Sequence, residues 1–282
     1  MKPLIQHVSD TAIWVAFCRA QESSRPDALV RDPLAKALVG DRGQAMADQM
    51  PELIPVMERW MGVRTAVIDE LILHAVDQGC DTVLNLAAGL DTRPYRLPLD
   101  SSIRWFEADF PRLIQHKETI LRHEKPHCQL KRQALDLEIS RNRQILLDQV
   151  IQDAKRALVL TEGLLMYWDP RTVRELACDL AERPAFQFWI TDLISPWGLE
   201  HMRDDFKAHL GPVEASLRFA PSDGPRFFES CGWKVSEVRS AAQEAKRLLG
   251  QSEAEIFEQW HLFADGDPTQ LTEHYRFVLL KR

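Results

Sequence analysis

Short apolar runs alternate with longer helical segments from residue 79 onward, and this alternation constrains the fold more than any other feature of the sequence. The runs are apolar enough to be buried strands, and glycine or proline stands at several of the junctions. The predicted strands are 82–88, 103–109, 129–136, 156–161 and 185–193, and the predicted helices are 112–124, 142–152 and 169–183. Strands that alternate with helices of about 10–15 residues are typical of a parallel sheet with helices on both faces. We therefore expect an α/β fold with a Rossmann-like sheet.

The flanking segments extend this sheet without adding a second domain. Apolar residues such as Val63, Val67 and Leu71 recur at helical spacing, which predicts helices in the N-terminal region. After Ser195-Pro196 the alternation gives way to a helical excursion. Later segments predict a helix at 226–231 ended by Gly232, a strand at 233–238, a helix at 253–263 and a last strand at 274–280. We expect one domain of about seven strands over 1–282, with a helical cap (1–78), a core (79–195), a lid (196–225) and a C-terminal part of the sheet (226–282).

Composition excludes several classes of protein. Lys and Arg number 35 against 42 Asp and Glu, a formal net charge of −7, and no run of five basic residues offers the phosphate contacts that nucleic-acid binding needs. Apolar runs near the N-terminus are far shorter than the ~20 residues of a membrane span, and a signal-peptide pattern is absent. The five cysteines form no C-x-x-C pair, so we expect free, buried thiols in a cytoplasmic protein.

The ends of the first two strands carry the residues that favour a ligand. In open parallel sheets, ligands bind beyond the carboxyl ends of the strands. Gly89 follows the first strand, and Glu107 and Asp109 end the second, so Asp109 lies 20 residues after the glycine, the spacing at which dinucleotide folds bind a ribose diol. Both features also have a purely structural interpretation. A glycine turn after a strand can serve only to connect the strand to the next helix, and acids at strand ends can be solvated or cap the next helix. Because G-x-G-x-x-G is missing, the sequence favours a nucleoside without a pyrophosphate, and S-adenosylmethionine has that chemistry.

Several segments together resemble the leucine carboxyl methyltransferase family, which includes bacterial O-methyltransferases of small molecules. They are VRTAVID (63–69), VLNLAAGLDTRPYRL (83–97), FEADFP (106–111) and EGLLMY (162–167). The segment RAQESSRPDALVRDPLA (19–35) is similar to the N-terminal signature of the bacterial members, and CGW at 231–233 and the closing HYRFVLLKR also match. The resemblance covers nearly the whole chain and implies a class I methyltransferase sheet with S-adenosylmethionine as cofactor.

The resemblance also implies roles for single residues. Arg64 would pair with the methionine carboxylate, Gly89 would lie under the methionine tail, and Glu162 would face the methionine moiety or its ammonium. Asp109 would bind the ribose hydroxyls with Glu107 as its neighbour. The expected adenine contacts are Asp136 and Leu137. One departure from the family pattern is Ala87, where the family has glycine; its methyl group is tolerable if the residue does not need a positive φ.

The sequence offers no acid–base constellation, and methyl transfer to a carboxylate needs none, because alignment alone can supply most of the catalysis. The resemblance places Tyr167 near the substrate in a positioning role, against the alternative of a core aromatic. His116, His123 and His127 lack a cysteine or carboxylate at ligand spacing, so no metal site is expected. His201 and His209 are candidate bases for a hydroxyl acceptor. The aromatic residues expected to line an apolar acceptor pocket are Trp14, Phe17, Trp197, Phe206 and Phe219.

The leading hypothesis is thus an S-adenosylmethionine-dependent O-methyltransferase acting on a carboxylate or hydroxyl of a small apolar or aromatic molecule. Methylation of a protein C-terminal carboxylate is the close alternative. A nicotinamide-dependent oxidoreductase is a more distant one, since the pyrophosphate loop is missing. A cofactor-binding protein without catalysis also stays open. The sequence does not indicate an oligomeric state.

Overall fold

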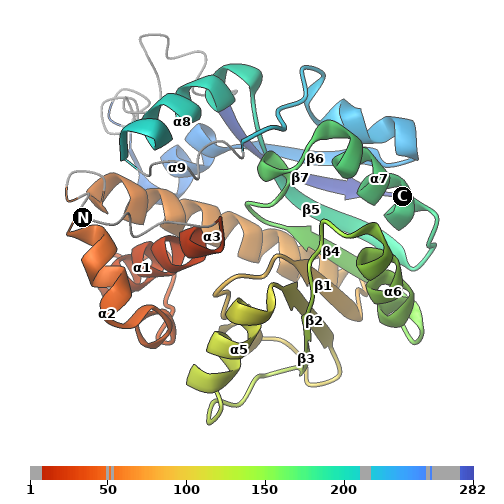
Figure 1. Cartoon of the computed structure of the whole chain (residues 1–282), viewed down its shortest axis with the longest axis horizontal. Coiled ribbons are helices and arrows are strands. Elements are labelled where there is room, and N and C mark those ends of the chain that lie inside the picture. The colour runs from red at the N-terminus through yellow and green to blue at the C-terminus, as the bar shows by residue number, and fades with distance from the viewer. Residues whose placement is uncertain (1–7, 49–50, 52–53, 210–216, 252–254, 256–273) are drawn as a thin grey trace.

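A seven-stranded sheet forms the centre of the computed structural model, which describes residues 8–48, 51, 54–209, 217–251, 255 and 274–282 (Figure 1). The strand order is β3-β2-β1-β4-β5-β7-β6, and β7 runs antiparallel to both of its neighbours. The strands are β1 (Thr82–Leu86), β2 (Arg104–Asp109), β3 (Gln129–Ala134), β4 (Ala157–Thr161), β5 (Phe186–Ile194), β6 (Lys234–Ser240) and β7 (Tyr275–Lys281). The order reverses between β1 and β4, which places the expected ligand-binding crevice at the carboxyl ends of these two strands. The predicted fold class is confirmed.

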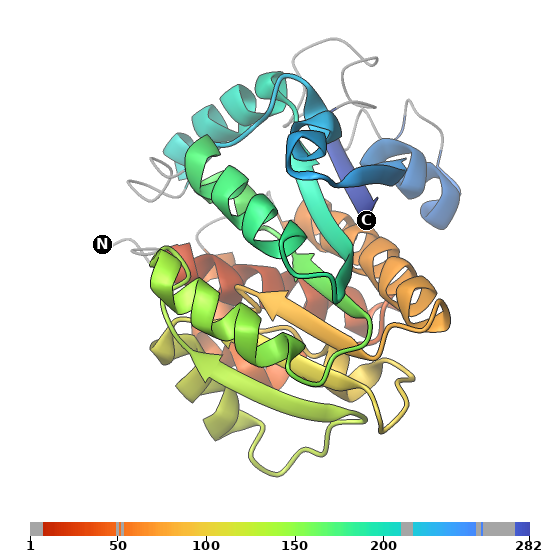
Figure 2. The ribbon, with the colours of Figure 1, turned by 90° about the vertical axis from the view of Figure 1, so that its right-hand side faces the viewer.

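Helices cover both faces of the sheet (Figures 1 and 2). The helices are α1 (Thr11–Ser24), α2 (Ala35–Ala47), α3 (Ile54–Asp77), α4 (Arg93–Arg96), α5 (Pro111–Ile120), α6 (Ser140–Ile151), α7 (Pro170–Ala181), α8 (Pro196–His209) and α9 (Ala241–Leu249), with 3₁₀ turns η1 (Val8–Asp10), η2 (Leu165–Tyr167) and η4 (Gly224–Cys231). The central strands are buried on both sides: in β4, Leu158 and Leu160 pack with α3 and α9, whereas Val159 packs with α6 and α7. This two-sided burial explains why the strands are continuous apolar runs.

The N-terminal helices form a third packing unit. Residues of α1 and α2, including Phe17 and Leu38, bury their side chains against Leu113 of α5 and Leu90, which follows β1. The cap is therefore packed directly on the segment after the first strand, in front of the crevice.

Element boundaries agree with the sequence to within a few residues, with instructive exceptions. Asp169 caps α7 as expected, because its Oδ1 accepts from the backbone N of Arg171 and of Thr172, both at 3.0 Å. The segment that ends at Gly232 is a 3₁₀ turn, and Gly232 has a φ of 91°. Helices α4 and α9 were not predicted. The helix predicted at 253–263 falls on residues outside the described ones, except for residue 255, which is helical.

The expectation of five free thiols is wrong for two of the cysteines. Cys178 of α7 and Cys231 at the end of η4 form a disulfide, with their Cα atoms 4.9 Å apart and a separation of 53 positions in sequence. Spacing along the chain gives no sign of this pairing, because it depends on how η4 packs against α7. Cys18, Cys80 and Cys128 are free and buried, as expected. Within the described residues, no helix has the length and apolarity required to cross a membrane.

Candidate active site

The turn after β1 (residues 87–91, here the β1 loop) has an unusual backbone. Ala87 has a φ of 54° and is the one non-glycine residue with a positive φ in the described part of the chain. Gly89, two residues later, has a φ of 50°. For an L-residue with a Cβ, this conformation costs roughly 1–2 kcal/mol. From the sequence, alanine is expected to be tolerable at this position if the residue does not need a positive φ. Residue 87 does have a positive φ, so this condition is not met.

Asp109 ties the β1 loop to the end of β2. Its Oδ2 accepts from the backbone N of Gly89 at 2.6 Å, and its Oδ1 accepts from the backbone N of Phe110 at 2.7 Å. The register of β1 against β2, Leu86 opposite Ala108, brings the carboxylate to this point. Burial raises the pKa of Asp109, although the two amide hydrogen bonds oppose the shift. Each oxygen keeps acceptor capacity for a further donor, such as a hydroxyl.

Glu107, two residues earlier, has a different environment. Its side chain is fully buried, and its oxygens accept from Nζ of Lys117 at 2.8 Å and from Nε of Arg132 at 2.9 Å. Arg132 also donates to the hydroxyl of Tyr95 at 2.7 Å. We call these four residues the Glu107 cluster. Since both carboxylate oxygens already have cationic partners, a contact between Glu107 and a ligand stays a prediction.

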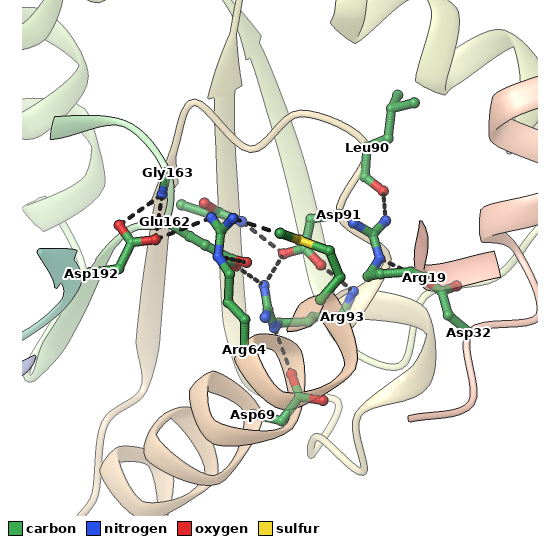
Figure 3. A network of polar contacts seen from close by, with 12 residues as sticks. Arg19, Asp32, Arg64, Asp69, Leu90, Asp91, Arg93, Glu162, Gly163 and Asp192 are labelled. Atoms are coloured by element: carbon green, nitrogen blue, oxygen red, sulfur yellow. Dashed lines mark hydrogen bonds and ion pairs between the residues drawn. The ribbon is translucent and has the colours of Figure 1, made fainter. Parts of the chain in front are cut away.

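A second set of buried charges lies at the carboxyl ends of β1, β4 and β5, between α3 and α4 (Figure 3). Arg93 is its centre: Nη1 lies 2.6 Å from Glu162 and 3.2 Å from Asp91, and Nε lies 2.6 Å from Asp69. We call this set the strand-end network. Its members are Arg64, Asp69, Asp91, Arg93, Glu162 and Asp192.

Arg64, from the long helix α3, joins two strand ends in this network. Its Nε lies 3.1 Å from Glu162, which follows β4, and its Nη2 lies 3.2 Å from Asp192 in β5. Asp192 also accepts from the backbone N of Gly163 at 2.9 Å and from the hydroxyl of Tyr275 in β7. Residues from α3, β4, β5 and β7 therefore meet at one point.

The charges of the network shift the pKa values of its members in opposite directions. Burial raises the pKa of Glu162, but Arg93 and Arg64 outweigh burial and hold it below its usual value. For Asp192 burial prevails over Arg64, and its pKa is raised. Burial lowers the pKa of Arg64, but Tyr275, Glu162 and Asp192 together raise it above its usual value. Glu162 is thus ionised at neutral pH beside a charged Arg64.

Several buried donors in this region have no hydrogen-bond acceptor. The Nε of Arg64 is near Glu162 but not aligned for a hydrogen bond, and its Nη1 donates to the sulfur of Met61 at 3.8 Å, a weak acceptor. Thr92 Oγ1 and Arg93 Nη2 are also buried without a hydrogen-bond partner. Since an unpaired buried polar group is costly, these donors favour a site that receives a polar ligand. A carboxylate and an ammonium fit an arginine beside an ionised acid.

The remaining predicted cofactor residues follow β3, the edge strand beside β2. Asp136 accepts from the backbone N of Glu138 at 2.9 Å through Oδ1, and Leu137 is buried. The backbone N of Leu135 donates to the carbonyl of Asp109 at 2.9 Å, so this segment begins directly beside the end of β2. Asp109 and residues 136–137 therefore lie close together at the carboxyl ends of β2 and β3.

Tyr167 lies in η2, close to both the cap and Arg64. Its hydroxyl is hydrogen-bonded to the side chain of Thr11 in α1, and burial raises its pKa against the effect of Arg64. The structure thus brings Arg64, Gly89, Asp109, Glu162 and Tyr167 to the crevice side of the sheet.

Most of the aromatic residues expected around a pocket lie in the core. Trp14 and Phe17 stack within the cap at a centroid distance of 6.2 Å, and Phe219 packs edge-to-face on Phe227. Trp197 contacts the ring of His274, with centroids 5.5 Å apart. Nothing is described of the side chains of His201, Phe206 and His209, although their backbone belongs to α8. His116 and His127 each have a hydrogen bond between a ring nitrogen and a backbone carbonyl. The carbonyls are those of Leu38, at 2.8 Å, and Leu97, at 2.7 Å.

Sequence reasoning missed Arg93, Asp192 and Tyr275. Arg93 lies in the segment 83–97 that resembles the family, and Asp192 is the second-last residue of the fifth predicted strand, so attention to every strand end would have pointed to both. Tyr275 has no local signal, because its role depends on β7 being inserted beside β5.

A family model described as leucine carboxyl methyltransferase matches residues 12–181, which is more than half of the chain. The chain belongs to the leucine carboxyl methyltransferase family. A relative from Frankia alni is 30% identical over 245 residues, covering 83% of this chain and 86% of its own length. One from Parafrankia sp. is 32% identical over 186 residues, covering 63% of this chain and 60% of that relative. Both carry the provisional name S-adenosyl-L-methionine-dependent methyltransferase.

A solved structure from Thermobifida fusca, provisionally titled a methyltransferase, aligns with a TM-score of 0.55 at 15% identity, over 100% of this chain and 95% of the other. At that identity the match establishes the shared fold.

Proposed function

We propose that this protein is an S-adenosylmethionine-dependent O-methyltransferase that methylates a carboxylate or hydroxyl of a small organic molecule. The observation that carries the proposal is Arg64, a buried guanidinium held between Glu162 and Asp192, with donors that have no strong acceptor. Its position at the strand ends, in a chain of this family with relatives named for this cofactor, supports S-adenosylmethionine as the ligand.

The residues fit the separate parts of this cofactor. Arg64 would bind the methionine carboxylate, and Glu162, kept ionised by two arginines, would accept from the ammonium. Gly89 would lie under the methionine tail, and Asp109 would accept from the ribose hydroxyls. At the adenine we expect Asp136 and Leu137. When bound, the cofactor supplies an electrophilic methyl group on a sulfonium.

The protein's part in catalysis is then binding and alignment. A carboxylate acceptor is already a nucleophile, so the site needs to hold it in line and exclude water. Tyr167, fixed by Thr11 and by its place beside Arg64, would position the acceptor through its hydroxyl. The cap (1–78) and the segment 196–225 would enclose the acceptor. Because the sequence of these segments contains the aromatic residues expected around a pocket, we propose that the acceptor is apolar or aromatic. The absence of a C-x-x-C pair supports the further proposal that the protein is cytoplasmic.

Calorimetry tests the cofactor. S-adenosylmethionine and S-adenosylhomocysteine should each bind with one site, and NAD⁺ should not bind. Failure of both methionine-derived ligands to bind would falsify the proposal, and binding of NAD⁺ alone would favour an oxidoreductase.

Transfer of a tritiated methyl group tests the reaction. Candidate small acids and phenols should accept label in proportion to enzyme. Label found instead on peptides with a free C-terminal carboxylate would favour a protein carboxyl methyltransferase. Cofactor binding without transfer to any acceptor in either set would favour a binding protein without catalysis.

A further inference from the structure

No single residue of the N-terminal signature at residues 19–35 has a role of its own in the function proposed above, yet one of them contacts the β1 loop. Arg19, in the second half of α1, is buried, and its Nη2 donates to the backbone carbonyl of Leu90 at 2.6 Å (Figure 3). Its Nε donates to Oδ2 of Asp32 at 3.0 Å. One guanidinium thus connects the cap to the loop across 71 positions in sequence.

Asp32, the partner of Arg19, is itself fixed by burial and by backbone hydrogen bonds. Its side chain is fully buried, and its Oδ1 accepts from the backbone N of Ala35 at 3.1 Å at the start of α2. Its own backbone N donates to the hydroxyl of Ser23 at 2.9 Å. A planar guanidinium fixed by such a carboxylate loses little further freedom when it donates to a carbonyl, so the Leu90 contact is preorganised.

Helix α1 touches the loop at a second point on the same face. Ala12 lies seven residues before Arg19, two helical turns away, and a Cβ placed on Gly89 would come within 3.2 Å of the Ala12 Cβ. The side chain of Leu90 is buried in the same cluster as Ile13 and Phe17. The loop is therefore fastened to α1 by its backbone and by its side chain.

The orientation of the Leu90–Asp91 peptide decides where the next charged group lies. Asp91 accepts from Asn85 at 2.8 Å and pairs with Arg93 at 3.2 Å, and Arg93 in turn pairs with Glu162. At the other end of the loop, Ala87 holds a backbone conformation that alanine disfavours. A loop strained at one end and charged at the other needs an external constraint to keep a single geometry.

We infer that Arg19, fixed by Asp32, is a positioning residue that sets the geometry of the β1 loop through the Leu90 carbonyl and thereby prepares the cofactor site. The cofactor part of this inference rests on the proposed function. The loop part does not, because it concerns the protein without ligand.

Hydrogen exchange without cofactor tests the loop directly. The backbone amides of residues 88, 89 and 91 all donate hydrogen bonds, so their exchange reports opening of the loop. In Arg19→Met we expect at least tenfold faster exchange in a peptide covering residues 87–92, with peptides of α6 and α7 unchanged. Arg19→Lys keeps the charge but not the fork of donors, so an intermediate acceleration is expected.

The matched control is Arg31, which belongs to the same signature and donates to two backbone carbonyls, those of Ser23 at 2.6 Å and Pro26 at 3.2 Å. Arg31→Met should leave exchange in residues 87–92 unchanged. Equal acceleration in both variants, or none in folded Arg19→Met, overturns the inference. If Arg19→Met does not fold, Arg19→Lys and Asp32→Asn decide it by the same measurement.

Calorimetry with S-adenosylhomocysteine then tests the consequence for the cofactor. We expect Arg19→Met to raise Kd about tenfold and Arg31→Met to leave it within twofold of the unsubstituted protein. A protein that binds no S-adenosylhomocysteine contradicts the proposed function and leaves the exchange result to decide the loop. Normal binding by the unsubstituted protein, with no change of Kd in Arg19→Met, contradicts the positioning role.

Discussion

The Glu107 cluster and the strand-end network are both buried assemblies of opposite charges at the same sheet, yet they differ in how completely their atoms are paired. In the Glu107 cluster each carboxylate oxygen has its own cation, and Arg132 also has the hydroxyl of Tyr95. In the strand-end network Arg64 faces a thioether, and donors of Arg64 and Arg93 lack hydrogen-bond acceptors. Buried charge alone therefore does not mark a binding site. Arg143 also has a buried Nε without a hydrogen-bond partner, so it is the combination of unpaired donors with a position at the strand ends that favours the strand-end network as the ligand site.

The largest effect should come from breaking the closed assembly. Lys117→Met leaves Glu107 with one cation inside the core, and we expect a loss of about 3–5 kcal/mol in the free energy of unfolding, measured by urea denaturation. The Kd for S-adenosylhomocysteine should stay within twofold. Lys125→Met, at an exposed lysine, serves as the control and should change neither quantity. If the loss in binding free energy, calculated from Kd, exceeds the loss in the free energy of unfolding, the Glu107 cluster belongs to the cofactor site.

Arg64→Ala should show the opposite pattern. Removing the guanidinium takes away the expected partner of the cofactor carboxylate, so Kd for S-adenosylhomocysteine should rise at least tenfold, about 1.4 kcal/mol, by calorimetry. Arg59→Ala is the control on the same helix: Arg59 pairs with Glu22 at 3.3 Å, away from the strand ends. Unchanged affinity in Arg64→Ala would make the strand-end network structural.

Asp109→Ala should also raise Kd at least tenfold, about 1.4 kcal/mol. The substitution removes both the expected ribose acceptor and the anchor of the Gly89 amide. Asp109→Asn keeps one oxygen that can accept a hydrogen bond, either from a ribose hydroxyl or from the Gly89 amide, so this variant should lose less affinity than Asp109→Ala. If the Asp109→Asn and Asp109→Ala variants bind the cofactor with the same Kd, the carboxylate of Asp109 does not contact the ribose.

The smallest effect concerns backbone strain beside the network. Ala87→Gly removes the roughly 1–2 kcal/mol cost of a positive φ but adds the roughly 0.5–1 kcal/mol cost of glycine, so the net gain in stability should lie between about 0 and 1.5 kcal/mol. Thermal unfolding measures it. Ala88→Gly, at a residue without a positive φ, should instead lower the melting temperature. A destabilised Ala87→Gly would show that the methyl group packs usefully.

The sequence predicted the strands well because each central strand is buried on both faces and so is a continuous apolar run. It also placed Gly89, Asp109 and Glu162 at or just after strand ends, where the structure has them; their contact with a ligand stays a prediction. It could not separate Glu107 from Asp109, because two acids on one strand look alike until Lys117 and Arg132 arrive from α5 and β3. Nor could it predict the disulfide of Cys178 and Cys231, which depends on packing between distant segments.

The place of β7 has a consequence for the order in which the site can be assembled. In the described sheet, β7 lies between β5 and β6 although it follows both in sequence, so β6 gains its sheet neighbour only when β7 is in place. Tyr275, the first residue of β7, donates to Asp192, which holds Arg64. During synthesis, every residue assigned to the cofactor therefore leaves the ribosome before the strand that completes their support. A nascent chain that stops before residue 275 would carry the residues proposed to bind the cofactor without the hydroxyl that fixes Asp192.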